Sequence, residues 1–106
     1  MLTITADDFD EMILRSDKPA LVEIYAPWCV YCRRIAPTYE KIAEQFGEKL
    51  TVGTIHYDEQ PELVKLFGIE TIPTLMLFRD GTLIGSVTAP SSKAEIEDFI
   101  LRTLEG

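Results

Sequence analysis

One stretch decides the fold of this chain: Ala20-Leu21-Val22-Glu23-Ile24-Tyr25-Ala26-Pro27-Trp28-Cys29-Val30-Tyr31-Cys32. Its first six residues are mostly apolar strand formers, a composition typical of a central strand buried on both faces. The residues that follow the second cysteine have helical spacing of their apolar side chains. The stretch therefore predicts a buried strand over residues 20–25, a short loop, and a helix that begins at a pair of cysteines.

Strands and helices alternate outward from this stretch. Asp80-Gly81 between two apolar runs predicts a β-hairpin, and Ser92-Lys93-Ala94-Glu95 predicts a capping box at the start of the last helix. We expect strands at residues 3–5, 20–25, 50–57, 74–78 and 82–87, and helices from Thr5 to Arg15, from Val30 to Phe46 with a kink at Pro37, from Pro61 to about Phe67, and after Ser92.

This order, βαβαβαββα, predicts an α/β fold. Alternating strands and helices imply a parallel sheet covered by helices on both faces, and the last hairpin makes the sheet mixed. At 106 residues, without repeats or a linker, the chain is expected to form a single domain over residues 1–106.

The composition limits the function classes. A net charge of −8 disfavours nucleic acid and anionic membranes as partners, and no apolar run is long enough to cross a bilayer. Residues 1–20 are acidic and lack the pattern of a signal peptide, so we expect a cytoplasmic protein, although a trimmed secreted protein would look the same. We also expect a monomer.

The chain has only two cysteines, Cys29 and Cys32, and one histidine, His56. Two cysteines so close together make no disulfide scaffold, and one chain does not supply the four ligands of a structural zinc site. We therefore expect no metal and no cofactor, unless two chains share their cysteine pairs. Two thiols separated by two residues at a helix start favour reversible disulfide exchange, because unpaired amides there stabilise a thiolate at the first cysteine.

Three separated motifs, in order, resemble those of the thioredoxin family: Ala26-Pro27-Trp28-Cys29 with Cys32-Arg33 and Ala36-Pro37; Gly68-Ile69 with Thr71-Ile72-Pro73-Thr74-Leu75; and Phe78-Arg79-Asp80-Gly81. The resemblance covers almost the whole chain. It implies the thioredoxin fold and a disulfide oxidoreductase without a cofactor.

The resemblance also implies residue roles. Cys29 corresponds to the exposed nucleophile and Cys32 to the more buried resolving cysteine. Glu23 occupies the position of a buried aspartate below the cysteines, and the family's lysine near that acid is Thr54 here. We expect Glu23 to be buried between its apolar neighbours and its pKa to be raised, since no cation accompanies it.

Further roles concern the surroundings of the cysteines. Trp28 corresponds to the tryptophan beside the site, and Ile72-Pro73 to the cis-proline loop that pairs with the substrate backbone. Asp58 corresponds to an acid that reaches Tyr25 or Trp28.

Two positions depart from the family pattern. Val30-Tyr31 stands where most thioredoxins have Gly-Pro, a dipeptide with a strong influence on redox potential. Tyr31 restores an amide at the helix start, which favours a Cys29 thiolate and a less reducing protein. The family's glycine after the last strand is replaced within Thr88-Ala89-Pro90.

The expected function is reduction of protein disulfides through a reversible Cys29–Cys32 pair, which a reductase of the thioredoxin-reductase type restores. Two alternatives stay open. One is a redox-linked binding module in which turnover is incidental. The other is a thiol oxidase or isomerase on the same fold, which the unusual Val30-Tyr31 dipeptide keeps in view.

Overall fold

A computed structural model describes residues 1–106, and its centre is a five-stranded mixed sheet. The sheet order is β1-β3-β2-β4-β5, with β1, β3 and β2 parallel and with β4 and β5 antiparallel to their neighbours. The strands are β1 (Leu2–Thr3), β2 (Ala20–Tyr25), β3 (Thr51–His56), β4 (Thr74–Arg79) and β5 (Thr82–Thr88). This arrangement confirms the predicted α/β class.

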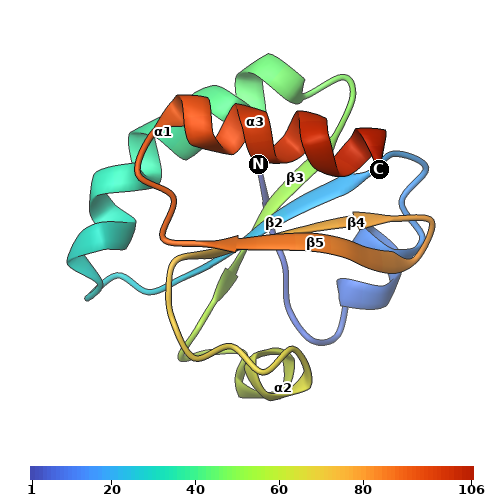
Figure 1. Cartoon of the computed structure of the whole chain (residues 1–106). Coiled ribbons are helices and arrows are strands. Elements are labelled where there is room, and N and C mark those ends of the chain that lie inside the picture. Colours follow the sequence, from blue (N-terminus) through green and yellow to red (C-terminus); the bar gives the residue numbers. More distant parts are fainter.

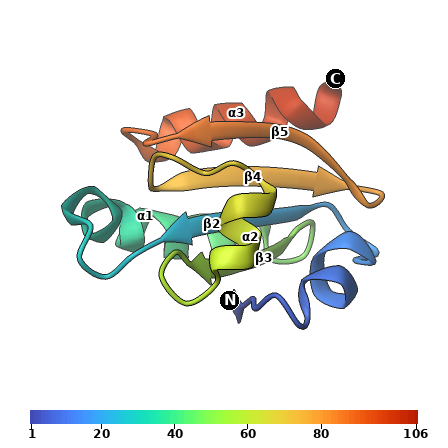
Figure 2. The same ribbon diagram turned by 90° about the horizontal axis from the view of Figure 1, so that it is seen from below.

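Helices cover both faces of the sheet (Figure 1). Helices α1 (Val30–Phe46) and α3 (Lys93–Glu105) lie on one face, and α2 (Pro61–Leu66) lies on the other, as the view from below also shows (Figure 2). A short π-helix, η1 (Asp10–Leu14), lies on the same side as α2. None of the helices combines the length and the apolar character needed to span a membrane.

Strand β2 contributes side chains to the apolar core on each face of the sheet. Leu21 belongs to the apolar cluster under α1 and α3, whereas Val22 and Ile24 belong to the cluster under η1 and α2. Side chains alternate along a strand, so Glu23 lies on the same face as Leu21, beneath α1. The strand ends at Tyr25, and the cysteine loop therefore begins at the edge of the sheet where the parallel strands end.

Helix α1 has the predicted bounds and contains Pro37. Its buried face includes Tyr39, whose hydroxyl lies 2.8 Å from the carbonyl oxygen of Gly53 and 3.2 Å from that of Leu21. The helix is thereby tied to β2 and β3 through a buried polar contact as well as through apolar packing.

The first helix is shorter than predicted. The helical segment is only Asp10–Leu14, and the side chain of Thr5 does not cap it. Residues 5–8 form a separate turn before it, in which the Asp8 N–H donates to the Thr5 carbonyl oxygen at 3.2 Å and the Asp8 carboxylate accepts the Thr5 N–H at 2.7 Å. Strand β1 is also earlier than expected, at residues 2–3, and β3 is one residue shorter at each end.

The last third of the chain follows the prediction closely. Asp80 and Gly81 have φ values of 53° and 78°, as a tight hairpin turn between β4 and β5 requires. The Ser92 hydroxyl accepts the Glu95 N–H at 3.1 Å, and the Glu95 carboxylate accepts the Ser91 N–H at 2.9 Å. This capping box begins α3, which buries Ile96 and Ile100.

Candidate active site

The cysteines lie at the start of α1. Cys29 is the N-cap residue, and its Sγ accepts the Cys32 backbone N–H at 3.2 Å. Its thiol lies 3.8 Å from the carbonyl oxygen of Ile72, to which it donates. Both thiols are reduced in this structure. The bond to Sγ comes from the Cys32 amide and not from that of Tyr31, which has no backbone acceptor and contributes only to the positive end of the helix.

Cys29 was expected to be exposed, and this was wrong. Its exposed fraction is 8%, against 3% for Cys32. Ile72 and Tyr57 pack against the cysteine pair and cover it. The order of accessibility is as predicted, with Cys29 slightly more exposed than Cys32.

The Cys32 thiol does not readily lose its proton. Burial raises the pKa of its thiol to about 12, and its hydrogen bond with Cys29 adds to the effect. Proton removal from Cys32 therefore needs a base close by.

Glu23 is buried, as the sequence predicts, with an exposed fraction of 4%. It lies opposite Thr54 in β3, and its Oε2 has no hydrogen-bond partner. Burial raises the pKa of the carboxyl to about 7. The predicted direction is confirmed, and its cause is loss of hydration without a compensating cation.

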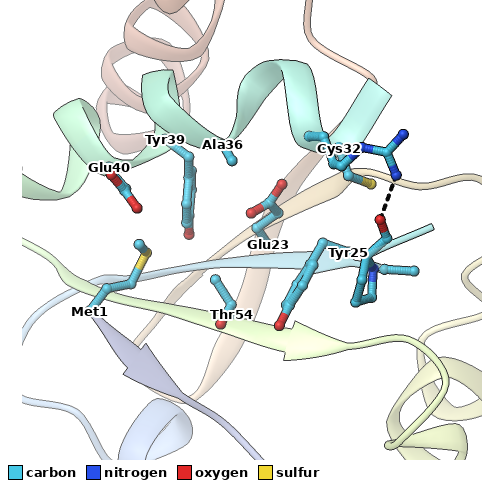
Figure 3. Close-up of a pocket in the computed structure, with 11 residues that line it drawn as sticks. Met1, Glu23, Tyr25, Cys32, Ala36, Tyr39, Glu40 and Thr54 are labelled. Carbon is cyan, nitrogen blue, oxygen red and sulfur yellow. Dashed lines mark hydrogen bonds between the residues drawn. The ribbon is translucent and has the colours of Figure 1, made fainter. Parts of the chain in front are cut away.

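Glu23 and Cys32 face one pocket of about 320 Å³ (Figure 3). Ala36 and Tyr39 of α1 and Thr54 of β3 form its walls. At its rim the Arg33 guanidinium donates to the Pro27 carbonyl oxygen at 2.7 Å, and the Arg33 side chain stays exposed to solvent. The pocket gives the buried acid room to exchange a proton.

Trp28 and Asp58 lie outside the pocket that Glu23 and Cys32 share. The Trp28 indole Nε1–H donates to Asp58 Oδ2 at 2.6 Å, so the predicted contact of Asp58 is confirmed for Trp28. The indole also meets the edge of Tyr57, and 60% of Trp28 stays exposed. His56 accepts the N–H groups of the following turn and takes no part in the cysteine site.

The loop before β4 completes the site. Ile72-Pro73 is a cis peptide, as expected. The Pro73 carbonyl oxygen accepts the Ala89 N–H at 2.7 Å, and Ala89 has φ of 46°. An alanine in this left-handed region costs roughly 1 kcal/mol, which explains why glycine suits the position. The contact of Ala89 with Pro73 was missed because nothing in the local sequence indicates it.

A buried dithiol at a helix start, with an acid that titrates near neutrality in the same pocket, is suited to the exchange of a disulfide with another molecule. The comparisons agree. The thioredoxin family model matches residues 1–102. The chain belongs to the thioredoxin family, and it is a thiol–disulfide oxidoreductase.

Individual relatives span nearly the whole chain. Thioredoxin of Alicyclobacillus acidocaldarius is 40% identical over 104 residues, which cover 98% of each protein. Thioredoxin 1 of Nostoc sp. is 36% identical over 101 residues, covering 95% of this chain and 94% of that protein. Protein disulfide-isomerase tigA of Aspergillus niger is 41% identical over 81 residues, covering 74% of this chain and 23% of that protein.

Proposed function

We propose that this protein reduces disulfides of other proteins in the cytoplasm, with Cys29 as nucleophile, Cys32 as resolving thiol and Glu23 as proton acceptor. One observation carries the proposal. Cys32, whose thiol has a pKa of about 12, faces the same pocket as Glu23, whose pKa is about 7. That both groups line one cavity supports Glu23 as the group that accepts the Cys32 proton.

The first step is attack by Cys29. Its thiolate forms a bond to one sulfur of the substrate disulfide, the substrate S–S bond breaks, and the other substrate sulfur leaves as a thiolate that takes a proton from water. The Cys32 N–H that donates to Cys29 Sγ stabilises negative charge on the attacking sulfur.

The second step is resolution by Cys32. Glu23 accepts its proton, directly or through water in the pocket, as Cys32 attacks Cys29 Sγ. The Cys29–Cys32 disulfide forms and the second substrate thiolate leaves. Because Cys32 is the weaker acid by a wide margin, proton transfer is expected to accompany sulfur attack and not to precede it.

Substrate binding is assigned to Trp28, Ile72 and Pro73 near Cys29. Asp58 holds the Trp28 ring through the indole hydrogen bond. The oxidised pair then needs two electrons from a dithiol donor, for which we propose a partner of the thioredoxin-reductase type. We propose that the chain acts as a monomer with a single domain over residues 1–106, since the whole site lies within one sheet and its helices.

Reduction of insulin by dithiothreitol tests the proposal. The wild-type protein should accelerate precipitation of the insulin B chain at catalytic concentrations. A binding module would bind partner proteins without accelerating this reaction, and that outcome would reject turnover as the function.

Glu23→Gln tests the acid directly. Glutamine keeps the shape of the side chain but accepts no proton, so resolution should slow by about 10-fold to 100-fold while the first attack changes little. Single-turnover measurements from pH 6 to 9 separate the two steps, and the wild-type resolving rate should rise through about pH 7. Equal resolving rates in both proteins would remove Glu23 from the mechanism.

The relation to a protein disulfide-isomerase makes an oxidase or isomerase the second candidate. The double variant Val30→Gly/Tyr31→Pro tests whether this dipeptide makes the protein less reducing. Proline removes the Tyr31 amide, and its contribution of about 0.5 to 1 kcal/mol to the thiolate corresponds to about 10 to 20 mV. Equilibration with a glutathione buffer should therefore give the variant the lower potential. An equal or higher potential would show that Tyr31 does not tune the couple.

A further inference from the structure

A small pocket lies beside the cysteines, between the first turns of α1 and the loop that joins β5 to α3. Its volume is about 190 Å³. Its lining includes Tyr31, Arg34 and Thr38 from α1 and Pro90, Ser91 and Ser92 from the loop. We call it the Arg34 pocket.

The loop that forms one wall of this pocket is joined to the reacting sulfur by short contacts. Ala89, which precedes Pro90, donates its N–H to the Pro73 carbonyl oxygen at 2.7 Å. The neighbouring Ile72 carbonyl oxygen accepts the Cys29 thiol at 3.8 Å. On the other wall, Tyr31 follows Cys29 by two positions. A substrate whose disulfide meets Cys29 therefore brings its flanking residues close to the Arg34 pocket.

The charge of the pocket is unusual for this protein. Arg34 is exposed, and its guanidinium makes no hydrogen bond and no ion pair in the structure, unlike that of Arg33. No carboxylate lines the pocket. The capping residue Glu95 is close to its loop wall, but one of its oxygens already accepts the Ser91 N–H at 2.9 Å. A chain of net charge −8 thus keeps an unpaired cation in a pocket at the first turns of α1, the helix that Cys29 caps.

The side of the cysteines away from the Arg34 pocket carries mostly negative charge. Asp58 and Glu70 line a separate pocket there, with Lys65 as its only cation. A substrate segment lying across the site therefore meets a positive end at Arg34 and a negative end near Asp58. Such an arrangement discriminates between substrates by charge and also fixes the direction in which the segment binds.

We infer that the Arg34 pocket binds an acidic side chain of the substrate protein, close in sequence to the cysteine that Cys29 attacks. A guanidinium binds a carboxylate through two parallel N–H···O bonds, and the hydroxyls of Tyr31, Thr38, Ser91 and Ser92 supply neutral donors around it. The pocket has room for one such side chain. This inference rests on the proposed function, because it names the substrates of the same site.

Matched peptide disulfides test the inference. The peptides are identical except for one residue next to the cysteine, which is Glu, Gln or Lys. Wild-type protein should reduce the Glu peptide about threefold to fivefold faster than the Gln peptide at low salt, as kcat/KM, because exposed ion pairs contribute on this scale. The preference should shrink at high salt, since the pair is open to solvent.

Variants assign the effect to one residue. Arg34→Gln should reduce the ratio of kcat/KM for the Glu peptide to that for the Gln peptide to about one. Arg34→Glu should lower this ratio below one and make the Lys peptide the fastest substrate. Arg15→Gln is the control, since it removes the same charge from an exposed residue just after η1, and it should keep the wild-type ratio. A wild-type ratio of one, or a ratio unchanged in Arg34→Gln, overturns the inference.

A binding measurement separates this inference from the proposed function. In the Cys29→Ser/Cys32→Ser variant, which performs no exchange, the S-methylated Glu peptide should shift the NMR signals of Tyr31, Arg34 and Ser91 more than the Gln peptide does at the same concentration. Equal shifts with both peptides reject the acidic subsite. Insulin reduction by the wild-type protein reports on the oxidoreductase function independently.

Discussion

Replacing Cys29 with serine abolishes disulfide exchange, whereas replacing Cys32 with serine leaves a protein that attacks once and stops. The expected loss in turnover is at least about 1000-fold for both variants, because a hydroxyl is a poor nucleophile at neutral pH. The difference lies in what accumulates. Cys32→Ser should trap substrate as a mixed disulfide on Cys29, which non-reducing electrophoresis and mass spectrometry detect.

The structure gives the reason for this asymmetry. Cys29 is the more accessible cysteine and accepts the N–H of Cys32, whereas burial raises the pKa of the Cys32 thiol to about 12. The Cys29→Ser variant is the matched control, and it should trap nothing. Trapping by Cys29→Ser in place of Cys32→Ser would mean that the two roles are reversed.

Glu23→Gln should stabilise the reduced protein at alkaline pH. The pKa of Glu23 is about 7 in the folded chain, against an ordinary value of 4.5. Because the folded state holds the proton more tightly, folding is favoured by protonation and loses stability as the pH rises from 4.5 through about 7. The difference corresponds to about 3 kcal/mol, and it is absent below pH 4.5 and complete above about pH 8.

Urea unfolding of both proteins, with the cysteines kept reduced, measures this effect from pH 4 to 9. The free energy of unfolding of the variant minus that of the wild type should rise by about 3 kcal/mol over this range. Any cost of placing an amide in the pocket does not vary with pH, so it shifts the curve without changing its slope. Glu44→Gln on the exposed side of α1 is the control and should give a flat difference. A flat difference for Glu23→Gln as well would mean that the acid is not perturbed.

Much of the fold could be predicted from the sequence because its signals are local. The run Ala20–Tyr25 is apolar on both faces and is followed by helical spacing that ends at Gly47, so β2 and α1 were predicted with their observed bounds. The burial of Glu23 followed from its apolar neighbours alone. The first helix is shorter than predicted because residues 5–8 form a separate turn, which the spacing of the apolar residues does not reveal.

Features that depend on distant segments could not be predicted. Cys29 is covered by a residue 43 positions later in the chain, so its burial is a property of the assembled sheet. The Arg34 pocket likewise needs a wall from the loop before α3. Nothing close in sequence to Arg34 indicates that Pro90, Ser91 and Ser92 lie beside it.

The strand order has a consequence for the newly made chain. Both cysteines have been synthesised by residue 32, yet β4, which brings Ile72 to Cys29, lies beside β2 only after a long further stretch has been added. Until then Cys29 lacks the cover that Ile72 gives it in the folded chain. The active site is thus completed late in synthesis, because a segment from the second half of the chain supplies one of its walls.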